Sequence, residues 1–227
     1  MAALNLRIAT RRSPLARAQA KLVSNLLVAA NPRLTTEMIL LDTIGDQERD
    51  RPIEDLGEQG VFSRAVQIAV LDDRADVAVH SFKDLPTAEM EELDVVAVPF
   101  REDPRDALVS PKGILLEDLP LGSRIGTGSL RRQALVKSIR PDLTLEPVRG
   151  NVDTRLKKLR QAGGPDALIL ATAGLNRLGL QNLISQHLPC MEFVAAVGQG
   201  ALAVETRTDD KFTTELASKI DHLETRQ

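Results

Sequence analysis

Short apolar runs alternate with segments of helical periodicity along this chain, and that alternation is the strongest limit on its fold. Leu4–Thr10 is typical of a buried strand. Ser13 and Pro14 then form a helix start, with a capping side chain followed by proline at the first helical position. Leucines and alanines recur at helical spacing until Asn31-Pro32 ends the run. Strands that alternate with helices in this way predict an α/β fold with mainly parallel sheets.

The alternation occurs in two series, which are separated near Pro99–Arg105. The expected elements of the first series after residue 32 are Thr36–Thr43, Phe62–Asp72, Asp76–Phe82 and Asp94–Pro99. The expected elements of the second series are Arg124–Thr127, Ser129–Arg140, Leu143–Val148, Asn151–Ala162, Ala167–Ala171, Ala173–Leu178, Ala201–Thr206 and Asp210–His222. Two series predict two domains. Residues 44–60 are polar and contain glycine, so we expect a mobile segment there.

Unusual polar and basic residues collect where the expected strands end. In α/β sheets, ligands bind outside the carboxyl ends of the strands. The segments at these ends are Thr10–Ser13, His80–Asp84, Thr127–Arg132 and Arg149–Arg155. If the two domains present their strand ends to each other, these residues would line an interdomain cleft.

Arginines stand at two expected helix starts, where the helix dipole favours acidic side chains. Ser129 and Asn151 are suitable N-cap residues for these helices. The arginines beside them are Arg131, Arg132, Arg149 and Arg155. Residues that oppose a local preference are expected at functional sites, and arginine forks with free backbone N–H groups suit a carboxylate or phosphate ligand. The alternative is that these arginines form a solvated helix face.

Lys83 and Asp84 follow an apolar strand and precede a proline. An aspartate there could accept N–H hydrogen bonds, hold a developing cation or move a proton. The alternative is a turn-forming aspartate beside a solvated lysine. Arg11 and Ser13 repeat the strand-end pattern, although Ser13 is also explained as a helix cap. His80 lies on an apolar strand and is interpreted as a packed core residue, not a base.

Composition limits the class of ligand. The 227 residues carry a net charge of −3, so the arginines form a local basic feature on a mildly acidic chain. Aromatic residues amount to 2%, without Trp or Tyr, which leaves little for stacking on bases. We therefore expect a small anionic ligand and no nucleic-acid binding. No stretch could span a membrane or serve as a signal peptide, which predicts a cytoplasmic protein, unless an organellar presequence has been removed.

Cys190 is the single cysteine, so the chain can hold neither an internal disulfide nor a cysteine-rich metal site. We expect it to be a small buried or half-buried residue. His187 and His222 have no metal-ligand spacing with it or with His80, and no metal site is expected. The segment Gly198-Gln199-Gly200 could let backbone approach a ligand, or could mark a bend between domains.

Seven blocks of this sequence resemble hydroxymethylbilane synthase, also called porphobilinogen deaminase, in the order of that family. The blocks are Arg12–Ala16 with Gln19, Val79–Pro86, Arg101–Ala107, Gly126–Arg132, Arg149–Leu156, Ala173–Gly179 and Ala196–Ala201. They extend over nearly the whole chain, and their combination is specific although no single block would be.

The resemblance implies a reaction that joins porphobilinogen units head to tail, with loss of ammonia, into the linear tetrapyrrole hydroxymethylbilane. It implies two domains like those of type II periplasmic binding proteins. The first would comprise residues 1–99 and a return segment at about 200–217, and the second residues from about 105 to about 195. It also implies a dipyrromethane cofactor and, as partners, porphobilinogen and oligopyrrole polycarboxylates. We expect a monomer.

By the same resemblance, Asp84 is the catalytic carboxylate, which would hold pyrrole N–H groups and stabilise the cationic azafulvene left when ammonia departs. Lys83 beside it would supply a further donor. The residues that would bind the acetate and propionate groups are Arg11, Ser13, Ser81, Thr127, Ser129, Arg131, Arg132, Arg149, Arg155 and Arg177. Phe62, Gln19 and Gln199 would line the cleft.

The sequence departs from the family pattern at three places. Gly128 replaces a residue with a hydroxyl group, and Gln59 stands where a lysine is common. The third departure is larger, since family members attach dipyrromethane to a cysteine in a C-terminal third domain. The sequence ends where the link to that domain would begin, so we expect that domain to be absent, and Cys190 does not correspond to the attachment cysteine.

Three interpretations follow from these departures. The chain could be a shortened or partial form of an ordinary synthase. It could be an enzyme that holds its pyrrole chain without a covalent anchor. It could also be a non-catalytic protein that binds pyrroles or other polycarboxylates. We favour the family function.

Overall fold

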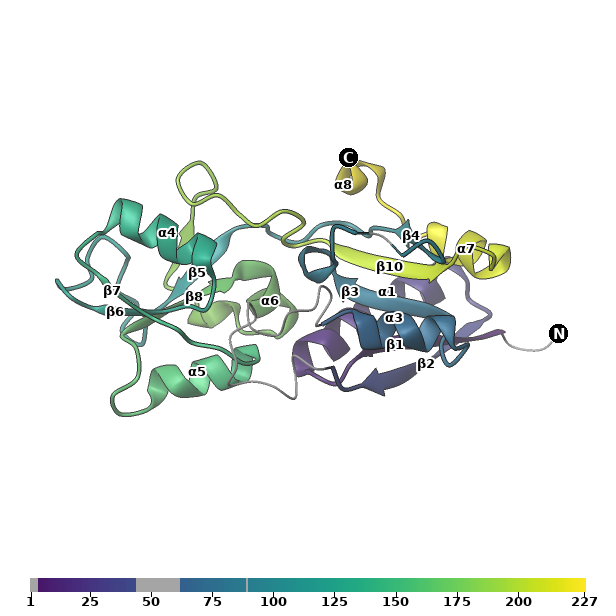
Figure 1. Ribbon diagram of the computed structural model, residues 1–227, viewed down its shortest axis with the longest axis horizontal. Coiled ribbons are helices and arrows are strands. Elements are labelled where there is room, and N and C mark those ends of the chain that lie inside the picture. Colours follow the sequence, from purple (N-terminus) through teal and green to yellow (C-terminus); the bar gives the residue numbers. More distant parts are fainter. Residues whose placement is uncertain (1–3, 44–61, 89) are drawn as a thin grey trace. The chain divides into compact units, whose positions relative to one another are not determined.

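The computed structural model describes residues 4–43, 62–88 and 90–227. The segment 44–60 that we expected to be mobile, with Gln59, lies outside these ranges. The chain forms two compact units (Figure 1): unit 1 comprises Met1–Glu102 and Ala201–Gln227, and unit 2 comprises Asp103–Gly200. Within the described ranges, no helix is both long and apolar enough to cross a membrane.

Unit 1 is built on a five-stranded sheet with the order β2-β1-β3-β10-β4. Its strands are β1 (Leu4–Arg11), β2 (Leu34–Leu41), β3 (Val77–Ser81), β4 (Leu93–Ala97) and β10 (Leu202–Arg207). β1 runs parallel to β2 and β3, whereas β10 runs antiparallel to β3 and β4. The late strand β10 therefore lies between two early strands and completes the sheet.

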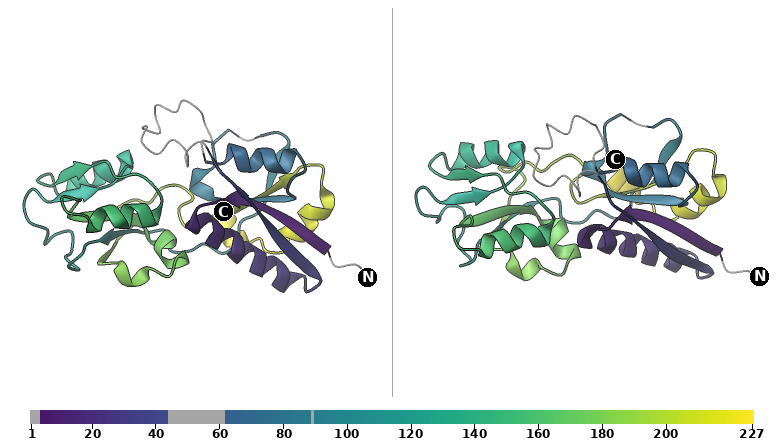
Figure 2. Two further views of the ribbon diagram at one scale, coloured as in Figure 1. Left: turned by 90° about the horizontal axis from the view of Figure 1, so that it is seen from below. Right: turned by 60° about the horizontal axis from the view of Figure 1, so that its bottom comes forward.

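Helices cover both faces of this sheet. They are α1 (Pro14–Ala30), α3 (Arg64–Leu71) and α7 (Lys211–Ser218), and the short α8 (Leu223–Arg226) follows. Leu6 and Ile8 of β1 pack in one buried cluster with α1 and α7, and Ala9 packs in another with α3, because successive strand side chains point to opposite faces. Figure 2 shows α1 running beside β1 and β2.

The start of α1 follows from local sequence. The Ser13 hydroxyl accepts a hydrogen bond from the Ala16 N–H at 3.3 Å, and Pro14 occupies the first turn. This is the expected cap, and it satisfies one of the N–H groups that a helix start leaves unpaired. The helix expected over residues 210–222 is divided instead, because α7 ends at Ser218 and α8 begins at Leu223.

Unit 2 has a second five-stranded sheet with the order β7-β6-β8-β5-β9. Its strands are β5 (Asp106–Val109), β6 (Arg124–Gly126), β7 (Thr144–Glu146), β8 (Ala167–Ala171) and β9 (Gln186–Leu188). Its helices are α4 (Leu130–Ile139), α5 (Val152–Arg160) and α6 (Thr172–Arg177). The residue Val136 of α4 packs on one face of the sheet, while Leu156 of α5 and Leu175 of α6 pack on the other.

Each sheet contains one strand that opposes the other four. In unit 1 this strand is β10, and in unit 2 it is β5, which runs antiparallel to β8 and β9. The expectation of mainly parallel sheets therefore holds for four strands of each sheet. Consequently, the carboxyl ends of β1 and β3 meet at one edge of the first sheet, and those of β6, β7 and β8 meet at one edge of the second.

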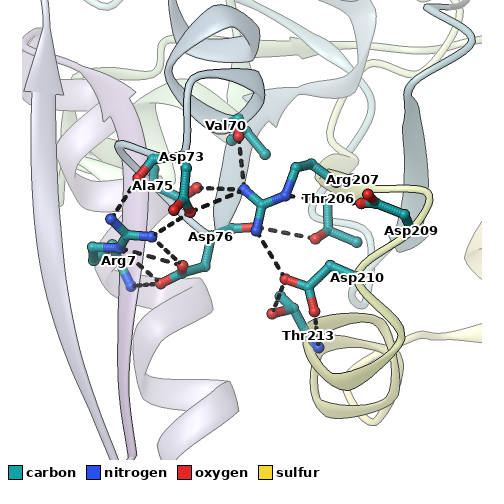
Figure 3. A network of polar contacts seen from close by, with 10 residues as sticks. All are labelled: Arg7, Val70, Asp73, Ala75, Asp76, Thr206, Arg207, Asp209, Asp210 and Thr213. Carbon is teal, nitrogen blue, oxygen red and sulfur yellow. Dashed lines mark hydrogen bonds and ion pairs between the residues drawn. The ribbon is translucent and has the colours of Figure 1, made fainter.

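A polar network secures the opposite edge of unit 1 (Figure 3). The Arg7 guanidinium of β1 bonds to Asp76 ahead of β3, with Nη2 2.7 Å from Oδ1, and also to Asp73. Arg207 at the end of β10 donates to the Val70 carbonyl and lies 3.1 Å from the Asp210 carboxylate at the start of α7. These charge-assisted bonds join β1, the start of β3 and the end of β10. They lie at the end of the sheet opposite to the strand-end residues.

Candidate functional site

The carboxyl ends of β1 and β3 bring several expected site residues of unit 1 together. Arg11 is the last residue of β1, and its guanidinium carbon lies 4.4 Å from the centre of the Phe62 ring. Ser81 is the last residue of β3, and Gln19 of α1 donates to its hydroxyl oxygen at 2.8 Å. The cation–π contact holds the Arg11 side chain at the end of β1, and the hydrogen bond holds the Ser81 side chain at the end of β3.

Asp84 lies in a single turn of 3-10 helix, Phe82–Asp84, that follows β3 directly. The Phe82 N–H donates to the Ala201 carbonyl at 3.1 Å, which ties this turn to the chain just before β10. The Asp84 side chain is half-buried and has no hydrogen bond or ion pair to any residue in the described ranges. Lys83 is exposed. A turn-forming aspartate would bond to its own turn, so the side chain of Asp84 is available for a ligand.

Two turns lie side by side at the carboxyl edge of the unit 2 sheet. The Thr127 N–H donates to the Glu146 carbonyl at 2.9 Å, which joins the end of β6 to the end of β7. A Cβ atom at Gly128 would lie 3.3 Å from Cγ of Arg149, so a side chain there would press on that arginine. The glycine that replaces a hydroxyl-bearing residue therefore leaves room for Arg149.

Ser129 caps α4 as expected, because its hydroxyl oxygen accepts from the Arg132 N–H at 3.5 Å. Asn151 occupies the N-cap position of α5, but its side chain makes no capping hydrogen bond. The Thr127 hydroxyl oxygen accepts from the Ser129 N–H at 3.2 Å. These local bonds hold the start of α4 against the end of β6.

Arg131 and Arg132 share one carboxylate, that of Asp106. Arg131 Nη2 lies 2.7 Å from Oδ2, and Arg132 donates to Oδ1 through Nε at 3.1 Å and Nη2 at 2.7 Å. Arg132 also donates to the Ile169 carbonyl and is buried. Burial alone would raise the pKa of Asp106, but the charge and hydrogen bonds of Arg132, followed by those of Arg131 and Gln199, outweigh it and hold that pKa below its usual range.

The remaining arginines of this edge differ in their partners. Arg155 Nε donates to the Gly150 carbonyl and Arg177 Nη2 to the Gly200 carbonyl, both at 2.6 Å. Nη1 of Arg149 is buried and has no hydrogen-bond partner within the described part of the chain. Because a buried N–H group without a partner is costly, Arg149 is the arginine best suited to accept an incoming anion.

Two site positions differ from the expectation drawn from the resemblance. We expected Arg132 to bind a pyrrole carboxylate, but its side chain is 7% exposed and is engaged with Asp106. The alternative of a solvated helix face is wrong for Arg132 as well. Gln199 is buried, and it donates to Asp106 and to the Pro104 carbonyl where we expected a cleft-lining side chain.

The expectation of a buried or half-buried Cys190 is wrong. Cys190 is exposed, because Phe193, which is 1% exposed, fills the core from the same turn after β9.

His80 is a packed core residue, as predicted. It is 5% exposed, and its Nε2 lies 2.8 Å from Oε2 of the buried Glu205 of β10. Gln67 of α3 donates to both oxygens of the same carboxylate, at 3.1 and 3.2 Å. In the ranges that the structure describes, no group of His, Cys, Asp and Glu side chains could hold a metal ion.

Sequence reasoning missed Asp106 as a residue of this edge. The sequence signal for it was an acidic residue directly before the apolar run Ala107–Val109. This run forms a central strand with a neighbour on each side, β8 and β9, and a residue at the start of such a strand is buried. A buried carboxylate needs cationic partners, and the nearby arginines supply them.

A protein-family model described as "Porphobilinogen deaminase, dipyromethane cofactor binding domain" matches residues 6–215. The chain belongs to the porphobilinogen deaminase family. The matched range includes the strand ends of both units, so every expected site residue lies within it. The resemblance carried by the seven sequence blocks is thereby confirmed.

Solved structures support the fold of this family member. The methionine binding protein MetQ is similar with a TM-score of 0.58 at 10% identity, over 95% of this chain and 89% of that chain. A periplasmic substrate-binding protein of a Coxiella burnetii ABC transporter gives 0.54 at 13% identity, over 95% and 91% of the two chains. A Salmonella typhimurium periplasmic binding protein with high arginine specificity gives 0.52 at 12% identity, over 99% and 95%. The two units are therefore of the type II periplasmic-binding-protein kind, as expected.

Proposed function

We propose that this chain is a transferase that condenses porphobilinogen head to tail, with loss of ammonia, into hydroxymethylbilane. The observation that carries the proposal is the half-buried Asp84 carboxylate, which has no partner in the described ranges and lies at the end of β3 in a porphobilinogen deaminase family chain. Its position suits a group that stabilises charge appearing on a ligand during reaction.

The substrate chemistry agrees with the arginines of unit 2. Each porphobilinogen carries an acetate and a propionate, so a growing pyrrole chain is a series of carboxylates. Arg131 has a partly exposed side chain, and Arg149 has a buried Nη1 without a partner in the described residues. Arginine binds carboxylates through short, charge-assisted hydrogen bonds, and pairing would relieve the cost at Arg149.

Asp84 would act on the aminomethyl carbon of the substrate. Departure of ammonia breaks the carbon–nitrogen bond and leaves a cationic azafulvene, whose charge a nearby carboxylate stabilises. The methylene carbon then bonds to the free α-carbon of the preceding pyrrole, which loses a proton. On release of the finished chain, the bond between the first unit's methylene carbon and its acceptor carbon breaks, and the acceptor carbon regains a proton. Water adds to that methylene carbon and loses a proton, which leaves the first unit with a hydroxymethyl group. Asp84 would also accept the pyrrole N–H groups and orient the rings.

The unit 2 edge fits the carboxylates of a dipyrromethane, because it combines an unpaired guanidinium N–H with hydroxyl and backbone donors. When bound, this cofactor supplies the pyrrole carbon to which the first unit is joined. The residues that would hold its carboxylates are Thr127, Ser129, Arg131, Arg149 and Arg155. Cys190 is not assigned as an attachment residue, because it lies upstream of Gly198–Gly200 and between matched family blocks.

Incubation of the purified protein with porphobilinogen tests the proposal, with product analysis and with mass measurements under native and denaturing conditions. We expect tetrapyrrole product. Product without added mass after denaturation would support an enzyme that needs no covalent anchor.

Binding without product would instead favour the non-catalytic binding protein, which the likeness to solute receptors keeps as the second candidate. A dipyrrole adduct on Cys190 would contradict our view of that cysteine.

A further inference from the structure

A fully buried carboxylate organises the arginine edge of unit 2. Asp106 is the first residue of β5 and pairs across the sheet with Ala171 of β8 and Leu188 of β9. Its side chain is 0% exposed. Because β5 is antiparallel to β8, the start of β5 lies at the carboxyl end of β8, where the ligand edge of the sheet is formed.

The Asp106 carboxylate accepts hydrogen bonds from three side chains. Oδ2 accepts from Arg131, and Oδ1 accepts from both Arg132 and Gln199. The Gln199 amide, 2.8 Å from Oδ1, also donates to the Pro104 carbonyl at 2.7 Å. The carboxylate is thereby connected to both ends of the unit 2 chain, since unit 2 begins at Asp103 and ends at Gly200.

The charges of this cluster do not cancel. One buried carboxylate faces two guanidinium groups, which leaves one net positive charge. The Arg132 side chain is 7% exposed, with donors directed to Asp106 and the Ile169 carbonyl, whereas the Arg131 side chain is 27% exposed. Of these two arginines, only Arg131 is therefore accessible to an anionic ligand. Arg132 is buried and stabilises the Asp106 carboxylate.

We propose that Asp106 is a positioning residue that fixes the Arg131 guanidinium for binding a pyrrole carboxylate. Asp106 holds one edge of the Arg131 fork, and the Val194 carbonyl accepts from Nη1 of the same group. A guanidinium held in this way loses little further rotational freedom when an anion binds, which strengthens the binding. The ligand part of this proposal rests on the proposed function, whereas the order of Arg131 does not.

Asp106→Asn tests the proposal, with Asp142→Asn as the matched control, because Asp142 also pairs with an arginine of unit 2 (Arg140, 2.6 Å) but precedes β7 at the other edge of the sheet. NMR of arginine side chains measures rotation of the Arg131 guanidinium without ligand. We expect hindered rotation in the wild type and in Asp142→Asn, and faster rotation in Asp106→Asn, where the bond to the Val194 carbonyl remains. Free rotation in the wild type, or unchanged rotation in Asp106→Asn, would overturn the proposal. If Asp106→Asn does not fold, free rotation in the wild type still overturns the proposal.

Porphobilinogen binding provides the second measurement. Asp106→Asn should weaken binding by about 10- to 100-fold, because a guanidinium that is no longer held in place loses most of its charged hydrogen bond to the ligand. In an Arg131→Met background the same substitution should have little further effect, because Asp106 acts through Arg131. An undiminished effect in that background would mean that Asp106 acts only on unit stability, and would overturn the proposal. A wild-type protein that does not bind porphobilinogen would contradict the proposed function, and the NMR result would still decide the role of Asp106.

Discussion

Replacement of Asp84 by asparagine should abolish most turnover while leaving the protein folded and able to bind. The side chain is half-buried, so an effective dielectric constant of about 20 is appropriate. A carboxylate about 4 Å from a developing unit positive charge then contributes about 4 kcal/mol, and an amide keeps only part of this. Loss of about 3–4 kcal/mol corresponds to a turnover lower by about 10²- to 10³-fold.

Binding and stability should separate from turnover in this variant. The Asp84 carboxylate makes no hydrogen bond within the described ranges, so its loss should change the free energy of unfolding by no more than about 0.5 kcal/mol. Stopped or continuous assays with porphobilinogen would give kcat and KM, and KM should be nearly unchanged. Asp94→Asn, at an exposed position of β4 in the same unit, is the control and should retain wild-type turnover. An Asp84→Asn enzyme within a few-fold of the wild type would refute the assigned role.

Three further outcomes are expected. Arg149→Met should weaken porphobilinogen binding by about 10- to 100-fold in calorimetry, because a charged hydrogen bond contributes about 1.5–3 kcal/mol. Arg160 is exposed in the last turn of α5, and the control Arg160→Met should leave binding unchanged. Burial would raise the pKa of Asp210, but hydrogen bonds from Thr213 and a neighbouring guanidinium lower it overall. The Asp210 carboxylate therefore stabilises the folded state fully above the unfolded pKa of about 3.9, and this stabilisation is lost as pH falls through the lower folded pKa. In urea unfolding at several pH values, Asp210→Asn should reduce the slope of the unfolding free energy against pH on the acid side. An unchanged slope would contradict this. Cys190 should react with a thiol reagent in the native state without loss of turnover, and protection from the reagent would contradict its exposure.

Elements set by local sequence could be predicted, whereas elements set by distant pairing could not. Ala167–Ala171 has the expected bounds because it is a continuous apolar run that follows turn residues and ends where helix α6 begins. β5 and β9 contain four and three residues, too few for a periodic signal. Their strand conformation depends on pairing of β5 with β8 and β9, which lie more than 50 residues further along the chain. Such non-local contacts leave no pattern within the segment itself.

The same distinction applies to the candidate site. The caps at Ser13 and Ser129 were predictable, because each side chain bonds to an N–H three residues ahead. The burial of Arg132 was not, since its carboxylate partner Asp106 is 26 residues away. The contact between Asp106 and Gln199 joins residues 93 positions apart. Sequence therefore indicated which arginines gather at the strand ends, while the structure distinguishes the buried Arg132 from the partly exposed Arg131.

We propose that this porphobilinogen deaminase family chain condenses porphobilinogen by means of Asp84. The most direct measurement is the amount of ammonia released by the wild-type protein, compared with the porphobilinogen consumed and the linear tetrapyrrole formed. We expect one ammonia for each porphobilinogen incorporated, with release nearly absent in Asp84→Asn. Binding of porphobilinogen by the wild-type protein without release of ammonia would contradict it.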